Sequence, residues 1–157
     1  MISHGDLRLL VLLLTGLPVS LCDLRTLIIP DRYVAAGALF AGVVVIRFPA
    51  LALCTAVGGL AGFLVFRTVW SLSRGGMGYG DVKYASFIGA ITGSDGFCFA
   101  LLVASLTGLV AALLILAVDG RGVRQRLPFA PFLTLGGAAS LIAERAGLPG
   151  LLRVGAP

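Results

Sequence analysis

Residues 96–118 read GFCFALLVASLTGLVAALLILAV and contain no charged side chain. An α-helix rises about 1.5 Å per residue, so about 20 apolar residues cross the roughly 30 Å hydrocarbon core of a bilayer. This stretch is therefore predicted to cross a membrane unaided, and it decides the class of fold for the whole chain.

The remainder of the chain has the same character. Of its 157 residues, 59% are hydrophobic and 12% are charged, whereas a soluble domain averages about 25% charged residues. Charged positions separate further apolar blocks at 9–22, 33–46, 48–66, 84–94 and 127–143, of which 84–94 is the weakest. The shorter blocks reach across a bilayer if their flanking residues form the interfacial turns. We predict an all-α, polytopic membrane protein of about six transmembrane helices, with a single membrane-embedded domain over residues 1–157.

The basic residues predict the orientation of these helices. Eight of the 12 Lys and Arg residues follow the first, third or fifth block. They are Arg25, Arg32, Arg67, Arg74, Lys83, Arg121, Arg124 and Arg126. The other four are Arg8, Arg47, Arg145 and Arg153. Cytoplasmic loops carry the excess of positive charge, so the first group is expected in the cytoplasm and both termini outside.

The charge and the cysteine content of the chain narrow the range of partners and metal sites to be expected. The net charge of +5 is explained by such loops, and no basic run carries the interleaved aromatic residues that stack on bases. We expect the lipid bilayer as a partner and no nucleic acid. Cys22, Cys54 and Cys98 stand singly, which argues against a structural zinc site. They are expected to be free, buried thiols.

Small residues recur at helical spacing in two of the apolar blocks. Gly58 and Gly62 give the third block a small face, and Ala104 with Gly108 gives one to the fifth. Such faces let helix backbones approach closely in a membrane. We interpret both as packing surfaces.

Two of the seven acidic residues occupy unusual places. Asp23 follows directly on the first apolar block in CDLRTLIIPD (22–31), and Asp81 precedes the fourth in GMGYGDVK (76–83). In the predicted topology both lie at cytoplasmic ends of membrane helices. Two carboxylates far apart in sequence can therefore share one level of the membrane.

This arrangement suits peptide hydrolysis by a shared water. Two neighbouring carboxylates cannot both ionise comfortably, so one keeps a proton. The ionised partner can accept a proton from water while the other donates to the substrate carbonyl, and neither metal nor cofactor is needed. Glycines around Asp81 would let the backbone bend and approach an extended peptide. The structural alternative is that Asp81 caps a helix and Lys83 anchors it at the interface.

These segments resemble a known family. The run GYGDVK (78–83) is similar to the GxGD-x-K signature of the type IV prepilin peptidases, a branch of the GxGD membrane aspartic proteases. Asp23, Arg25 and IPD (29–31) resemble the family's first aspartate motif, and LPFAPFL (127–133) resembles its C-terminal Pro-Phe-x-Pro-Phe segment.

The resemblance implies that Asp23 and Asp81 are the catalytic pair. It further implies an active-site loop supported by Gly78, Gly80, Lys83, Arg25 and Pro30. The substrate would be a type IV prepilin or pseudopilin of a pilus or secretion system. Its short basic leader would be cut at the cytoplasmic face of a bacterial inner membrane.

Two further expectations concern the form of the enzyme. Long members of the family carry an N-terminal segment with paired cysteines and also methylate the new N-terminus. This chain starts almost at its first core helix and has no Cys pair, so we expect a short, peptidase-only form without methyltransferase activity. The role of Asp31 stays open, as does the oligomeric state.

Other classes of function also fit an apolar chain. A non-enzymatic assembly or transport subunit of a pilus or secretion system is the main alternative. A transporter would more often place charges near the bilayer midplane, whereas the charges here stand at the edges of the apolar blocks. The lipoprotein signal peptidase is another small membrane aspartic enzyme, but its motifs are arranged differently.

Overall fold

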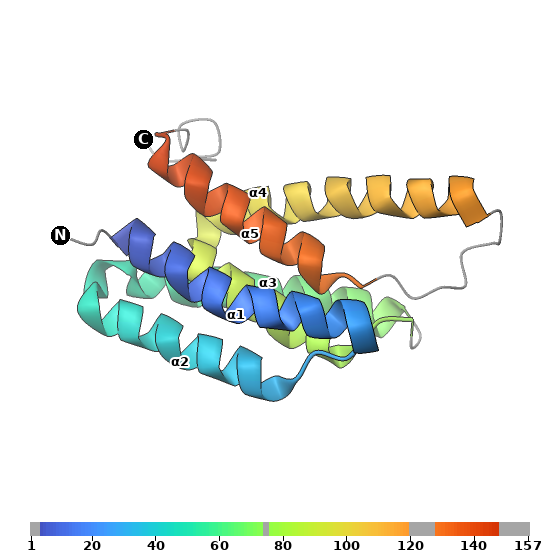
Figure 1. The fold of residues 1–157 in the computed structure, drawn as a ribbon. Coiled ribbons are helices and arrows are strands. Elements are labelled where there is room, and N and C mark those ends of the chain that lie inside the picture. The colour runs from blue at the N-terminus through green and yellow to red at the C-terminus, as the bar shows by residue number, and fades with distance from the viewer. Residues whose placement is uncertain (1–3, 74–75, 120–127, 148–157) are drawn as a thin grey trace.

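The computed structural model describes residues 4–73, 76–119 and 128–147, and every regular element in these ranges is helical. The elements are α1 (His4–Thr26), α2 (Asp31–Arg47), the 3-10 helix η1 (Pro49–Leu51), α3 (Ala52–Leu72), α4 (Tyr79–Asp119) and α5 (Ala130–Arg145). They form an elongated bundle (Figure 1). The all-α prediction is confirmed for the described residues.

The predicted fourth and fifth blocks form one 41-residue helix, α4, that is interrupted at Gly93 (φ 78°, ψ 175°). Glycine adopts this backbone conformation without the steric penalty of a side chain. The chain turns back at this point (Figure 1), so that the two halves of α4 run in opposite directions along the bundle. Split at Gly93, the helices reproduce the six apolar blocks of the sequence.

Arg8 of α1 hydrogen-bonds the backbone next to this break. Its side chain is buried, and its Nε donates to the carbonyl of Ile91 at 2.6 Å. That carbonyl lies in the last turn before the break, where helical acceptors lose their partners. The same guanidinium binds both carboxylate oxygens of Glu144 on α5 at 3.1 Å, which ties α1, α4 and α5 together at this end.

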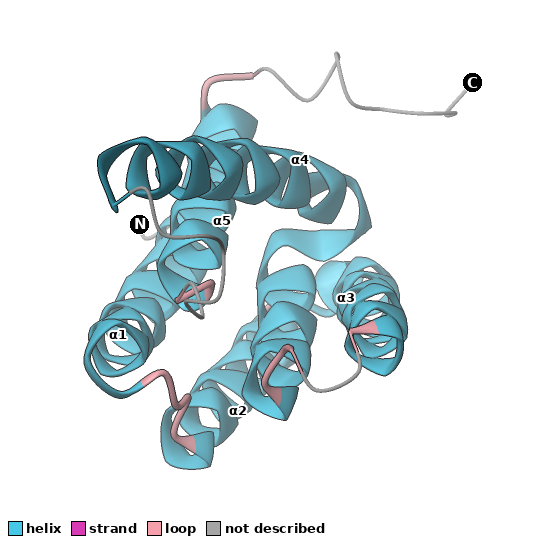
Figure 2. Cartoon of the chain, turned by 90° about the vertical axis from the view of Figure 1, so that its right-hand side faces the viewer, coloured by secondary structure: helices cyan, strands magenta, loops and turns pink. Residues whose placement is uncertain are grey.

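The first half of α4 lies in the interior of the bundle. Val82, Tyr84, Ala85 and Ile88 have no exposed surface. Figure 2 looks along the bundle from the end where α1 finishes, with α1, α2 and α3 on different sides and the second half of α4 across the top. Because this segment faces protein rather than lipid, its hydropathy is weak, which explains why it is the least convincing span in the sequence.

The number of membrane spans is not confirmed as six. Three described stretches are long and apolar enough to cross a bilayer, namely His4–Thr26, Pro49–Leu72 and Tyr79–Val118. Helices α2 and α5 have 17 and 16 residues, which corresponds to about 24–26 Å of helix. These two helices are short for a full crossing.

Close backbone contacts hold α3 against α4. A Cβ added to Gly58 would overlap the carbonyl of Gly89, one on Gly89 would overlap that of Gly58, and one on Gly62 would overlap that of Ala85. The predicted small face of the third block is therefore confirmed as a packing surface. In the fifth block Ala104 is fully buried, whereas Gly108 makes ordinary contact distances to Phe129 and Phe132.

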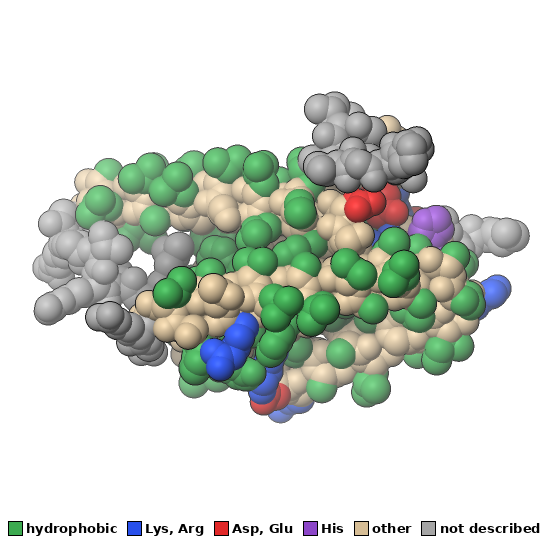
Figure 3. All heavy atoms as spheres, turned by 180° about the vertical axis from the view of Figure 1, so that it is seen from behind, with side chains coloured by type: hydrophobic (Ala, Val, Ile, Leu, Met, Phe, Trp, Pro, Cys, Tyr) green, Lys and Arg blue, Asp and Glu red, His purple; other side chains and the backbone are tan. Residues whose placement is uncertain are grey.

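The surface is largely apolar, as a membrane protein requires. Most of the coloured side chains on the face seen in Figure 3 are hydrophobic, and many leucines of α1, α3 and α4 are more than half exposed. Cys54 and Cys98 are exposed on this surface and Cys22 is half-buried, all as free thiols. The expectation of buried cysteines is wrong, because apolar positions here face outward.

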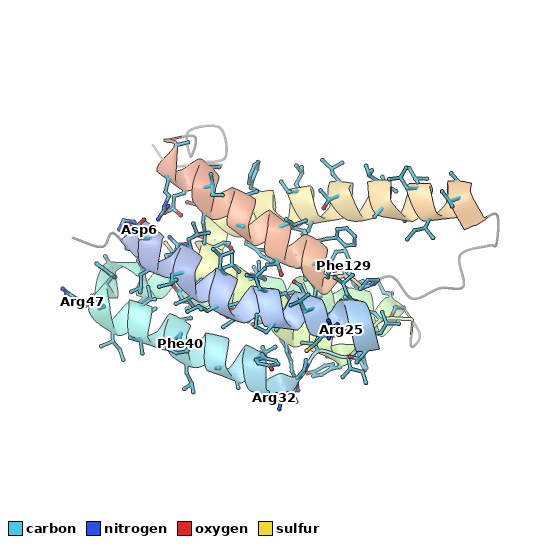
Figure 4. The ribbon with its side chains drawn as sticks, in the orientation of Figure 1. Asp6, Arg25, Arg32, Phe40, Arg47 and Phe129 are labelled. Atoms are coloured by element: carbon cyan, nitrogen blue, oxygen red, sulfur yellow. The ribbon has the colours of Figure 1, made fainter. Side chains whose placement is uncertain are left out.

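The basic residues divide between the two ends of the bundle. Arg25 and Arg32 lie at one end, and Arg47 lies at the other (Figure 4). This matches the grouping that the sequence predicts. Five further positions used in that prediction lie outside the described residues, namely Arg74, Arg121, Arg124, Arg126 and Arg153.

The α3–α4 contact yields a test with a matched control. Gly58→Ala should lower the free energy of unfolding by about 1–3 kcal/mol, because its methyl group overpacks a backbone crossing. Gly42→Ala, on α2 with nothing within 4 Å of an added Cβ, should leave stability unchanged or raise it by up to about 1 kcal/mol. Thermal unfolding in detergent measures both. Equal midpoints for the two variants would contradict the packing assignment.

Candidate active site

A pocket of about 710 Å³ lies where α1 ends and α4 begins. Asp23 and Asp81 both line it, although they are 58 positions apart in the sequence. Gly78, Gly80 and Lys83 also line this pocket, whereas Arg25 and Pro30 do not. The structure thus brings together five of the seven residues that the sequence singles out.

Asp23 belongs to the last turn of α1 and is 4% exposed. Its Oδ2 accepts a hydrogen bond from the backbone N–H of Ala130 at 2.9 Å. Ala130 is the first residue of α5, where backbone N–H groups have no helical acceptor and favour a negative group. The α5 helix begins within the Pro-Phe segment, and its N-terminus therefore lies against the Asp23 carboxylate.

Asp81 lies in the first turn of α4, and its N–H donates to the carbonyl of Gly78 at 3.2 Å. The Asp81 carboxyl group interacts electrostatically with Asp23. Asp81 Oδ1 is the one buried side-chain N or O atom without a hydrogen-bond partner in the described part of the chain. Buried polar atoms are nearly always paired, so this oxygen offers a free acceptor to a water or a substrate.

The link from α1 to α2 packs directly against the start of α4. A Cβ added to Gly80 would lie 2.9 Å from the Cβ of Ile29, so the absence of a side chain lets Ile29 sit on this turn. Gly80 is part of the helix, and its place differs from the bending role that the sequence suggests. The first aspartate motif and the GxGD motif are therefore in contact.

Leu27 carries an unusual backbone within this link. Its φ is 54°, the one positive value among described residues other than glycine, and its N–H donates to the carbonyl of Asp23 at 2.9 Å. A bulky residue in this region is strained by about 1–2 kcal/mol, and such strain concentrates at functional sites. Leu27 lines the pocket, and no turn residue in the sequence marks it.

Lys83 and Asp31 form an ion pair at the pocket. Lys83 Nζ lies 2.7 Å from Asp31 Oδ2, and the two side chains are 41% and 70% exposed. An exposed pair of this kind stabilises a fold by at most about 1 kcal/mol. It does, however, join the first turns of α2 and α4 beside the two aspartates. The sequence leaves the role of Asp31 open and treats Lys83 only as an anchor or motif residue.

The two remaining candidates lie outside the pocket. Arg25 is exposed at the end of α1 (Figure 4). Pro30 immediately precedes α2 with φ −70°, so it sets the start of that helix. Within the ranges that the structure describes, no group of three or more His, Cys, Asp or Glu side chains is placed to hold a metal ion.

The fold and the site together define a polytopic membrane helix bundle with a pair of carboxylates in a pocket near one end. Residues 9–113 match the model of the type IV leader peptidase family, and the chain belongs to this family. That match includes both Asp23 and Asp81.

Curated relatives support the same assignment. The chain is 33% identical over 132 residues to a prepilin leader peptidase/N-methyltransferase of Burkholderia pseudomallei, covering 80% of this chain and 42% of the relative. It is 33% identical over 142 residues to a protein of that name from Pseudomonas putida, covering 86% and 49%. The chain thus spans about half the length of the relatives that it matches. No solved structure gives a significant match.

Because the two aspartates have different surroundings, replacing each with Asn should change the stability of the protein by a different amount. Asp81→Asn should leave the thermal midpoint unchanged or raise it, because it replaces a carboxyl group that has a buried oxygen without a partner and that interacts with a second carboxyl group. Asp23→Asn weakens a charge-assisted hydrogen bond from α5 and should lower stability by about 1 kcal/mol or more. Thermal unfolding of the two variants in the same detergent provides the comparison. A larger loss in Asp81→Asn than in Asp23→Asn would contradict the described environments.

Proposed function

We propose that this chain is a membrane aspartic endopeptidase that removes the short basic leader from type IV prepilin or pseudopilin precursors. One observation carries the proposal. Two carboxylates from distant segments line one pocket, and one of them keeps a buried, unpartnered oxygen. Membership of the type IV leader peptidase family supports the choice of substrate class.

The two aspartates divide the chemistry between them. Asp23 accepts the backbone N–H bond of Ala130, which favours a carboxylate anion, whereas Oδ1 of Asp81 has no hydrogen-bond donor. We therefore assign Asp23 the ionised role and give Asp81 the shared proton. Asp23 takes a proton from a water whose oxygen attacks the scissile carbonyl carbon, while Asp81 donates its proton to the carbonyl oxygen. The tetrahedral intermediate then loses its C–N bond: the leaving amine receives the proton held by Asp23, and one hydroxyl of the intermediate returns its proton to Asp81, which restores the starting state of the pair. No metal or cofactor enters these steps.

The walls of the pocket suit a peptide that joins a basic leader to an apolar helix. Val65, Phe66 and Leu101 give it an apolar side, next to which the start of a pilin helix can lie. Asp31 presents a carboxylate that is 70% exposed and can attract a Lys or Arg of the leader. The same pocket contains the catalytic pair.

The proposed location is a bacterial cytoplasmic membrane with the pocket facing the cytoplasm. Arg25 and Arg32 lie at the site end of the bundle (Figure 4), and Lys83 lines the pocket itself. Positive residues favour the cytoplasmic side. Precursors synthesised in the cytoplasm would meet the site there.

The proposal for this chain covers the peptidase step. The names of the relatives also include an N-methyltransferase, an activity that we do not propose for this chain. The described residues supply a carboxylate pair suited to hydrolysis. The absence of methyltransferase activity remains a prediction from the sequence.

Cleavage of a prepilin-like peptide tests the proposed function. The purified protein in detergent should cut a peptide with a basic leader and an apolar helical start, at the junction between them. Asp23→Asn and Asp81→Asn should each lower kcat/KM by about 10²- to 10⁴-fold or more, because general acid–base groups contribute this much. Mass spectrometry of the products locates the cleaved bond.

Asp95→Asn provides the matched control. Asp95 is exposed and does not line the pocket, so this variant should cleave at the wild-type rate. Activity should also survive EDTA, and loss with EDTA that zinc restores would contradict the aspartic mechanism. Failure of a well-folded wild type to cut several leaders would favour a non-enzymatic assembly or transport subunit.

A further inference from the structure

Three side-chain hydroxyls from three helices form a hydrogen-bonded cluster one helical turn further into the bundle than the aspartate pair. Thr134 Oγ1 on α5 lies 2.8 Å from Ser20 Oγ on α1 and 2.7 Å from the hydroxyl of Tyr84 on α4. All three side chains are buried. The mechanism proposed above uses none of them, and no sequence motif includes them.

The protons of this cluster can be assigned by counting. Thr134 also lies 2.8 Å from the carbonyl of Ala130, an acceptor to which its hydroxyl donates. A hydroxyl has one proton and two lone pairs, so Thr134 must accept from both Ser20 and Tyr84. Each of the three hydroxyls then donates one hydrogen bond, and Thr134 is the hub of the network.

Ser20 and Tyr84 each lie three residues from one of the two aspartates, on the same helix. Ser20 precedes Asp23 by three residues on α1, and Tyr84 follows Asp81 by three residues on α4. Residues three apart share a face of a helix, so each hydroxyl lies one turn further into the bundle than its aspartate. On α5, the N–H of Ala130 binds Asp23 while its carbonyl receives Thr134.

Gly16 of α1 has no side chain and so leaves room for Thr134 and the Tyr84 hydroxyl to approach each other. A Cβ on Gly16 would lie 2.6 Å from Thr134 Cγ2 and 2.9 Å from the Tyr84 hydroxyl oxygen. Both distances are too short for real side-chain contacts. A substitution here would push the network apart from the α1 side without removing any hydroxyl.

We propose that Thr134 is a positioning residue whose hydrogen bonds to Ser20 and Tyr84 fix the separation and orientation of Asp23 and Asp81. Its effect on catalysis rests on the proposed function. Side-chain hydrogen bonds between helices are among the few directional contacts in an apolar bundle, and these two lie one helical turn from the aspartates. Small displacements of catalytic groups are costly for the rate.

The test uses variants of Thr134 in the full chain with the prepilin-like peptide. Thr134→Val removes the hydroxyl at nearly constant volume and should lower kcat by about 10-fold or more through misplacement of the pair, with little change in KM. It should also move the pH optimum of kcat, because the two carboxylates interact through their separation. Thr134→Ser should restore both, and Gly16→Ala should resemble Thr134→Val.

Thr92→Val is the matched control. Thr92 is as buried as Thr134 but hydrogen-bonds only the carbonyl of Ile88 in its own helix. Its removal should keep the wild-type kcat and pH profile. A wild-type kcat and pH profile for Thr134→Val, or equal losses in the Thr134 and Thr92 variants, would overturn the proposal. If Thr134→Val does not fold, Tyr84→Phe combined with Ser20→Ala takes its place under the same criteria.

A second readout does not depend on cleavage. With Cys22, Cys54 and Cys98 replaced by Ala, Asp23→Cys and Asp81→Cys can be joined by a short bifunctional thiol reagent. Adding Thr134→Val should slow this cross-linking, whereas adding Thr134→Ser or Thr92→Val should not. An unchanged rate with Thr134→Val would overturn the positioning role. A wild type that does not cleave would instead count against the proposed function alone.

Discussion

A carboxylate buried in an apolar bundle must find a hydrogen-bond donor, and Asp23 finds one at the N-terminus of α5. The hydrogen bond from Ala130 N to Asp23 Oδ2 joins the end of the first helix to the start of the last described one. It places the Pro-Phe segment over the pocket and leaves Asp81 as the second carboxylate of the site. The strained backbone of Leu27 and the packing of Ile29 on Gly80 are compatible with a fold organised around this contact.

Much of this architecture can be predicted from the sequence because a bilayer imposes simple constraints. Apolar blocks of near-spanning length predict helices, and isolated acidic residues at their edges predict a site. The small face at Gly58 and Gly62 predicts a close crossing. Asp23 and Asp81 can be paired because alternating spans return to the same side of a membrane, and the structure places both in one pocket.

The remaining features depend on tertiary partners, which periodicity does not reveal. Hydropathy underrates the first half of α4 because this segment contacts protein, and the break at Gly93 is one glycine among many. Arg8 reads as an interfacial charge, yet it is buried against Glu144. The hydroxyl of Thr134 has no local signature either, since its partners are more than 40 residues away.

The central claim is that Asp23 and Asp81 act as one pair, and a double-mutant cycle with glutamate tests it most directly. Asp23→Glu, Asp81→Glu and the double variant keep both carboxylates but move them by one methylene, and kcat/KM is measured for each. Residues in contact show coupling of about 0.5–3 kcal/mol, whereas distant ones are additive within about 0.5 kcal/mol. The account predicts strong coupling for this pair and none between Asp81→Glu and Asp95→Glu. Independent, multiplicative losses at positions 23 and 81 would contradict a shared catalytic site.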